Sequence, residues 1–153
     1  VNEFEGKFGR DNVGWSEMDV TSRESVRKAF TGAALRFGGV DLVVNNAGIS
    51  ISKPLEAHTD QDWDLLYDVL VKGQFTVSSE AVNTLKQQGI GGDIINIVSK
   101  NALVSGPNNA GYGSAKAAQL HLSRLMAAEL GPHKIRVNVV NPEALRAGAR
   151  AVQ

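Results

Sequence analysis

Short apolar runs alternate along the chain with longer stretches whose apolar residues recur every three or four positions. The runs at residues 40–44, 94–98 and 135–140 predict buried strands, and residues 14–18 fit a further strand. The longer stretches predict helices over about residues 22–37, 60–88 and 112–130. Strands that alternate with helices in this way are typical of an α/β fold, with a doubly wound parallel sheet covered on both faces.

The residues at the ends of the predicted helices support this segmentation. Thr21 with Glu24, and Thr59 with Asp62, have the spacing of a capping box, in which each side chain takes up a free backbone N–H. Gly38 follows the first helix, as is usual for a left-handed C-cap. No linker, repeat or low-complexity tract separates the segments, so we expect one domain over residues 1–153.

Polar residues follow three of the predicted strands at the point where each strand ends. They are the Asn-Asn-Ala-Gly segment at residues 45–48, Ser99, and Asn141 with Pro142. In parallel α/β sheets, ligands bind beyond the carboxyl ends of the strands. We therefore expect the functional site to be built from these three segments.

Composition narrows the class of protein. The 16 basic and 16 acidic residues balance, which disfavours the positive surface that nucleic acid or an anionic membrane would require. The chain has no cysteine, which excludes disulfides and thiolate metal sites, and its 3 histidines lack the spacing of metal ligands. The sequence has neither a membrane-spanning run nor the pattern of a signal peptide. We expect a cytoplasmic protein without metal, membrane anchor or nucleic-acid partner.

Tyr112 and Lys116 are four residues apart in the last predicted helix, which places both side chains on one helix face. Free phenols ionise near roughly pH 10, and a neighbouring ammonium favours the phenolate. A tyrosine in such a pair can both give and accept a proton near neutrality. Taken alone, the pair also fits an ordinary surface helix, so its meaning depends on the motifs around it.

Those motifs occur in a recognisable order: Asn-Asn-Ala-Gly at residues 45–48, then Ser99, then Tyr112 and Lys116 in the spacing Tyr-x-x-x-Lys. In this order they resemble the short-chain dehydrogenase/reductase family, and the resemblance covers nearly the whole chain. It implies a Rossmann-like fold and reversible hydride transfer between NAD or NADP and a carbonyl or alcohol. The implied partner is a small-molecule substrate.

The resemblance also implies a role for each matching residue. Tyr112 would be the general acid/base, Lys116 would support it and hold the nicotinamide ribose, and Ser99 would hydrogen-bond the substrate oxygen. Gly48 would permit close approach of the cofactor. The residues that the resemblance places at the cofactor are Asp19, Val20, Asn45, Ala47, Gly48, Tyr112, Lys116 and Pro142.

A narrower resemblance concerns residues 40–55, 63–73 and 92–116. These stretches are similar to the dehydrogenase portion of the bifunctional rhamnulose-phosphate aldolase/short-chain dehydrogenases of bacterial sugar catabolism. The similarity implies a role in rhamnose catabolism and a small hydroxy-aldehyde, sugar or polyol as substrate. It also implies a longer chain that carries an aldolase domain, and membership of the wider family implies a homo-oligomer.

Three departures from the family pattern leave a second interpretation open. The glycine-rich phosphate loop is missing, because Gly6, Gly9 and Gly14 have the wrong spacing, so we expect a domain truncated at both ends and incomplete without its first strand. Leu70 stands where many members carry an asparagine that holds a water, and Asn101 is a candidate substitute. Glu143 replaces the glycine that often follows Pro142. The alternative is a non-catalytic dehydrogenase-like domain that serves as a binding or structural module.

Overall fold

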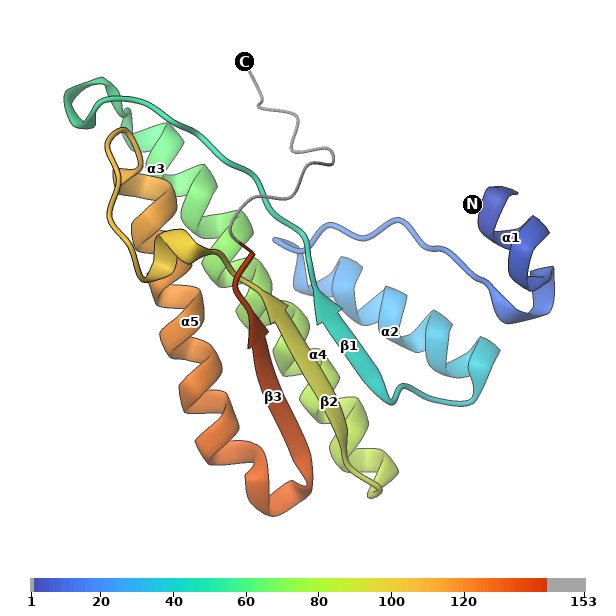
Figure 1. Cartoon of the computed structure of the whole chain (residues 1–153). Helices are drawn as coiled ribbons and strands as arrows, with labels where there is room; N and C mark the ends of the chain where they lie inside the picture. Colours follow the sequence, from blue (N-terminus) through green and yellow to red (C-terminus); the bar gives the residue numbers. More distant parts are fainter. Residues whose placement is uncertain (1, 143–153) are drawn as a thin grey trace.

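A three-stranded parallel sheet forms the centre of the computed structural model, which describes residues 2–142 (Figure 1). The strands are β1 (Leu42–Asn45), β2 (Gly92–Ile97) and β3 (Ile135–Val140), in the order β1-β2-β3. Both pairings are parallel. Parallel neighbours need a crossover between them, and here each crossover is helical. The predicted α/β fold with a parallel sheet is confirmed, and within residues 2–142 no strand precedes β1.

The helices after residue 20 lie in the segments that the periodicity predicts, and the helix at Asn2–Phe8 is one that it did not predict. The helices are α1 (Asn2–Phe8), α2 (Arg23–Phe37), α3 (Asp60–Tyr67), α4 (Gly73–Gln88) and α5 (Ala110–Leu130). Gly38 ends α2 in the left-handed conformation, as predicted. Within residues 2–142, no helix combines the length and apolar character that crossing a lipid bilayer would require.

The main core lies between the sheet and helices α2, α4 and α5. Val43, Ile94 and Val137 are aligned by the strand register and so share one face of the sheet. They pack with Phe30 from α2, Ala81 and Leu85 from α4, and Leu130 from α5. On the opposite face Leu42, Val44 and Val140 stay about half exposed. In the described part of the chain, the helices therefore cover one face of the sheet, as the view in Figure 1 shows.

Two predictions at the start of the chain are wrong. Residues 14–18 form no strand, and the Trp15 side chain is 72% exposed. A strand needs a hydrogen-bonding neighbour, and this segment does not pair with the sheet. The N-cap of α2 is Ser22, whose side chain accepts from Ser25 N, and not Thr21. Thr21 lies in the turn before the helix, where its backbone N–H and its hydroxyl both donate to the Asp19 carboxylate, and the first helical bond runs from Val26 N to Ser22 O.

The predicted helix over residues 60–88 begins as expected but is not continuous. Thr59 and Asp62 form the predicted capping box, and Lys53 Nζ adds an ion pair 2.7 Å from the Asp62 carboxylate. Together, Lys53 and the Thr59 backbone lower the pKa of Asp62 to about 2. A π turn at Asp68–Lys72 then separates α3 from α4. Such single turns contain one residue too many for α-helical pairing, and they are frequent at functional sites.

Glu80 links α4 to α2, and its loss should destabilise the fold. The buried carboxylate accepts from Arg23 (3.1 Å) and Arg27 (3.3 Å), and the hydrogen bonds from these guanidinium groups lower its pKa. Because both arginines are partly exposed, we expect Glu80→Gln to cost about 1–2 kcal/mol at pH 7. The cost is measured by urea unfolding.

The pH dependence of the stability loss in Glu80→Gln tests whether the ion pairs of Glu80 cause it. A carboxyl whose pKa is lower in the folded state stabilises the fold above its unfolded pKa and loses that contribution as the pH falls through the folded value. The gap between wild type and Glu80→Gln should therefore narrow below about pH 4.5. Asp68→Asn, at an exposed ion pair with Lys72, is the matched control and should change little. A gap that persists at pH 3 would contradict the electrostatic explanation.

Candidate active site

Ser99 lies two residues after the end of β2, where the chain turns into a short 3-10 helix (Lys100–Ala102). Its side chain caps this turn by accepting from Asn101 N at 3.2 Å. The backbone on both sides is anchored to the end of β3, because Val98 N donates to Val140 O and Lys100 N to Pro142 O. Ser99 is thereby held at the carboxyl end of the sheet, where the sequence predicts the site.

Helix α5 carries Tyr112 and Lys116 on one face. Lys116 Nζ lies 5.7 Å from the centre of the Tyr112 ring and donates to Ile97 O at 3.1 Å. Since Ile97 is the last residue of β2, this bond ties Lys116 to the strand that leads into Ser99. The structure thus brings Lys116 to the end of β2, with Tyr112 one turn earlier on the same helix face.

The environment of Lys116 suits a group that binds hydroxyls. The residue is only 5% exposed, and burial lowers the pKa of its ammonium to about 8. An ammonium has three N–H donors, and within the described residues Lys116 uses one of them, on Ile97 O. Two donors therefore remain for acceptors such as the hydroxyls of a ribose. This donor set fits the nicotinamide-ribose half of a dinucleotide cofactor.

The Asn45 turn is joined to the helices by a buried polar chain. Asn45 Nδ2 donates to Ser78 Oγ (2.9 Å) and to Asn96 Oδ1 (2.7 Å), which connects β1 with α4 and β2. Asn96 Nδ2 in turn donates to Ser123 Oγ on α5 at 2.8 Å. These bonds give Asn45 a defined side-chain orientation at the end of β1. Ala47 and Gly48 follow it in the exposed part of the turn.

Leu70 occupies the core beneath this turn. It is fully buried, packs with Leu66 and Ala115, and is contacted by Tyr112 at the edge of the cluster. A Cβ placed on Gly48 would lie 3.2 Å from Leu70 Cδ2, so the turn approaches the leucine closely. The position at which many family members carry asparagine is therefore an apolar packing position in this chain.

The remaining predicted residues lie at the edges of this arrangement. Asp19 is exposed, and its hydrogen bonds from the Thr21 hydroxyl and backbone lower its pKa. Val20 packs against the start of α4, because a Cβ on Gly73 would lie 2.8 Å from Val20 Cγ2. Pro142 accepts from Lys100 N, next to Ser99. Glu143 lies outside the described residues.

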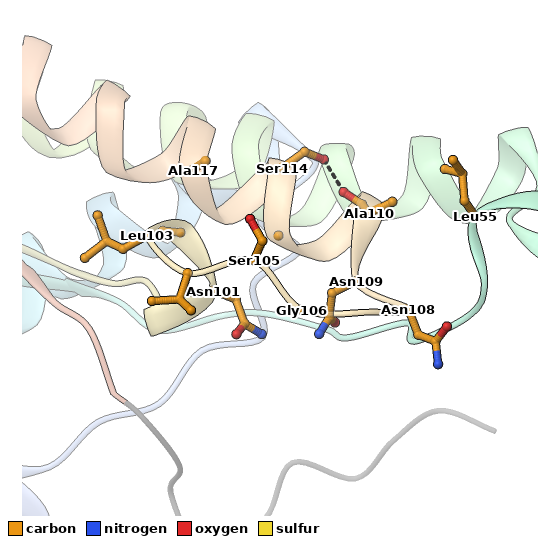
Figure 2. Close-up of a pocket in the computed structure, with 13 residues that line it drawn as sticks. Leu55, Asn101, Leu103, Ser105, Gly106, Asn108, Asn109, Ala110, Ser114 and Ala117 are labelled. Atoms are coloured by element: carbon orange, nitrogen blue, oxygen red, sulfur yellow. Dashed lines mark hydrogen bonds between the residues drawn. The ribbon is translucent and has the colours of Figure 1, made fainter.

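A cavity of about 490 Å³ adjoins the start of α5 but does not include the predicted catalytic residues (Figure 2). It lies between the loop at residues 101–109 and the α5 side that carries Ser114 and Ala117. Helical periodicity puts these two residues on the side of α5 away from Tyr112. Asn101 lines this cavity, and within the described chain its side chain makes no hydrogen bond. A relay through Asn101 therefore gains no support from the geometry.

We expect Leu70→Asn to destabilise the protein rather than to improve the site. The exchange removes an apolar side chain from the cluster that includes Leu66, Ala115 and Tyr112. It also buries an amide for which the cluster offers no hydrogen-bond partner, so the free energy of unfolding should fall by about 2–4 kcal/mol in total. Thermal or urea unfolding measures this cost. Leu70→Met, which conserves volume, is the matched control and should cost less than about 1.5 kcal/mol. Equal stability of Leu70→Asn and wild type would show that this position accommodates a polar relay.

Sequence reasoning missed a set of buried polar residues. Gln74, Asn96, Gln119 and Ser123 are all nearly inaccessible to solvent, and hydrogen bonds link them. One signal was present, since Gln119 lies one helical turn after Lys116 on the same face. His58 is half-buried, and both of its ring nitrogens are buried without a hydrogen-bond partner among the described residues.

Comparison with known proteins identifies the family. The family model for short chain dehydrogenases matches residues 1–152. The chain belongs to the short-chain dehydrogenase family. An uncharacterized oxidoreductase of Bacillus subtilis, YuxG, is 42% identical over 149 residues, which is 97% of this chain and 22% of that protein. Carbonyl reductase [NADPH] 2 of Sus scrofa is 38% identical over 82% of this chain and 50% of its own length.

A solved member of the short-chain dehydrogenase family supports the same assignment. The structure of a gluconate 5-dehydrogenase from Burkholderia cenocepacia, in complex with NADP and tartrate, matches with a TM-score of 0.82 and 32% identity. The match covers 86% of this chain and 51% of that protein. The chain thus spans about half the length of the carbonyl reductase and the gluconate dehydrogenase, and a smaller share of the Bacillus protein. The Rossmann-like fold of the family accounts for the parallel sheet and its helical crossovers.

Proposed function

We propose that residues 1–153 form one domain of an NAD(P)-dependent oxidoreductase, which interconverts an alcohol and a carbonyl. The observation that carries the proposal is the placement of Lys116, whose buried ammonium reaches the end of β2 beside Ser99 and shares a helix face with Tyr112. A bound nicotinamide would supply the hydride acceptor or donor at its C4 atom. The protein must then accept or donate the hydroxyl proton of the substrate.

In the direction of oxidation, Tyr112 Oη takes the hydroxyl proton as the substrate carbon loses its hydride, and the C–O bond becomes C=O. Ser99 Oγ hydrogen-bonds the same oxygen and orients it. Lys116 would hold the ribose hydroxyls with the two ammonium donors that no described residue uses, and its charge would stabilise negative charge on Tyr112 Oη during the transfer. Asp19, Val20, Asn45, Ala47, Gly48 and Pro142 border the cofactor in this proposal.

For the substrate we propose a small hydroxy-aldehyde, sugar or polyol. Support comes from the name of one related structure, a gluconate 5-dehydrogenase, and from the polar character of Ser99 and Asn101 after β2. We further propose a cytoplasmic homo-oligomer that acts in rhamnose catabolism and is joined to an aldolase domain. The match to YuxG covers only 22% of that relative, which supports a dehydrogenase segment within a longer polypeptide.

The test is a titration of NADH and NADPH into the purified 153-residue chain and into the protein as its genome encodes it. Nicotinamide fluorescence reports binding. Absorbance of the reduced nicotinamide reports turnover, with NADH or NADPH as hydride donor for small aldehydes and sugars, and with NAD or NADP as hydride acceptor for polyols. We expect binding and turnover in the genome-encoded protein. Binding to neither protein would overturn the enzyme proposal and favour a non-catalytic binding or structural module.

A further inference from the structure

A pair of glutamines joins α4 and α5 next to the π turn. Gln119 Nε2 donates to Leu70 O at 2.7 Å, and Gln74 Nε2 donates to Gln119 O at 3.3 Å. The Gln119 side chain of α5 thus contacts the backbone of the π turn, and the Gln74 side chain of α4 contacts the backbone of α5. Gln74, Gln119 and the Leu70 carbonyl are called the amide clasp below.

The clasp lies at the π turn. At Asp68–Lys72 the helix widens, and Gly73 N donates to Asp68 O, five residues back. A turn of this kind interrupts the regular α-helical pairing of backbone N–H and C=O groups. Leu70 O lies in the middle of the turn, and it accepts a hydrogen bond from the Gln119 side chain on α5.

The clasp acts on the part of α5 that carries Lys116. The neighbours Ala115, Ala117 and Ala118 have no hydrogen-bonding side-chain atoms, so the nearest directional side-chain contact after Lys116 is that of Gln119. Gln119 lies one turn beyond Lys116 and is buried. Ser123, one turn further, donates to Gln119 O and accepts from Asn96. A continuous polar chain therefore runs from the π turn, along α5, to the Asn45 turn.

We propose that Gln119 is a positioning residue, which sets the rotation of α5 through Leu70 O and thereby aims Lys116 Nζ at the carboxyl end of β2. The geometric part of this inference stands on the hydrogen bonds alone. Its consequence for catalysis rests on the proposed function. Without the clasp, α5 rotates more freely, and Lys116 Nζ leaves Ile97 O and gains contact with solvent.

The experiment measures the ionisation of Lys116 by NMR in the nucleotide-free, genome-encoded protein labelled with [ε-13C]lysine. Gln119→Met removes the donor and keeps a similar volume. The matched control is Gln88→Met, which removes the hydrogen bonds of Gln88 with the Val40 backbone at the far end of α4. The Lys116 signal is assigned by its absence from Lys116→Met.

In wild type we expect a Lys116 pKa of about 8, the value that burial gives it. In Gln119→Met the pKa should rise by about one unit as the ammonium regains solvent, and Gln88→Met should leave it unchanged. In turnover assays kcat should fall about tenfold in Gln119→Met, with KM for the alcohol less affected. A folded Gln119→Met protein with an unchanged Lys116 pKa would overturn the proposal.

If Gln119→Met does not fold, Gln119→Asn keeps an amide but shortens the side chain by one carbon, which withdraws the donor from Leu70 O. An unchanged Lys116 pKa in that variant overturns the proposal as well. The experiment distinguishes a failure of the clasp proposal from a failure of the oxidoreductase proposal. A raised Lys116 pKa without turnover in any variant supports the clasp and rejects the oxidoreductase. Normal turnover with an unchanged Lys116 pKa rejects the clasp and supports the oxidoreductase.

Discussion

Tyr112→Phe should lower kcat by about 10²–10⁴-fold, because it removes the hydroxyl that we propose as the acid and base of the reaction. The ring itself remains, and it packs with Leu66, Leu70 and Ala115 in a cluster that the exchange does not alter. Stability and cofactor affinity should therefore stay close to those of wild type. Steady-state turnover, nicotinamide fluorescence titration and urea unfolding measure the three quantities.

The matched control for this exchange is Tyr67→Phe. Tyr67 stacks on Trp63, with ring centres 4.8 Å apart, and packs against the same cluster. Its hydroxyl has no assigned part in the reaction, so Tyr67→Phe should keep normal turnover. Normal turnover in Tyr112→Phe would show that the role proposed for Tyr112 is wrong.

Lys116→Met should show opposite effects on activity and on stability. Turnover and cofactor affinity should both fall, because the donor for the ribose hydroxyls and the charge beside Tyr112 are lost. In the nucleotide-free protein, however, the free energy of unfolding at pH 7 should rise by up to about 3 kcal/mol. The reason is that burial lowers the pKa of Lys116 from 10.5 to about 8, so the charged form destabilises the fold.

The pH dependence of stability tests whether the charged Lys116 destabilises the folded state. Below about pH 8 Lys116 is charged in both the folded and the unfolded state, and the full penalty of burial is present. Between pH 8 and 10.5 the folded state releases its proton while the unfolded state keeps it, so the stability contributed by this group rises with pH. The difference between Lys116→Met and wild type should therefore vanish near pH 10.5.

Unfolding by urea at pH 7, 9 and 10.5 measures this dependence. Lys72→Met is the matched control, because Lys72 is exposed and pairs with Asp68 on the surface, where such pairs contribute little. It should show no comparable change with pH. A Lys116→Met protein that is less stable than wild type at pH 7 would mean that Lys116 is better solvated or better paired than the structure indicates.

Local patterns were sufficient for the parts of the protein that depend on neighbours in sequence. Residues 135–140 were predicted as a strand with the bounds that β3 has, because their apolar run is bordered by a Gly-Pro break and by Asn141 with Pro142. The Thr59 capping box and the left-handed Gly38 were also found. Caps and turns involve residues within one helical turn of each other, so their spacing is visible in the chain.

The order of the Asn45, Ser99, Tyr112 and Lys116 motifs was equally accessible, because it indicates the family and places all four residues at strand ends or on one helix face. Other features depend on contacts between distant residues. Residues 14–18 have the composition of a strand and form none, since no neighbouring strand pairs with them. Thr21 has the spacing of a cap, but the Asp19 carboxylate takes up both of its donors.

The sequence by itself therefore determined the class of fold, the residues that we propose for the chemistry and the end of the sheet at which they gather. Only the tertiary structure decided how those residues are held. In the structure Leu70 is a buried core residue within a π turn, and its backbone carbonyl accepts a hydrogen bond from Gln119 of another helix. The physical reason is that a buried carbonyl must be paired, and only the packing of α4 against α5 determines which side chain is near enough to do so.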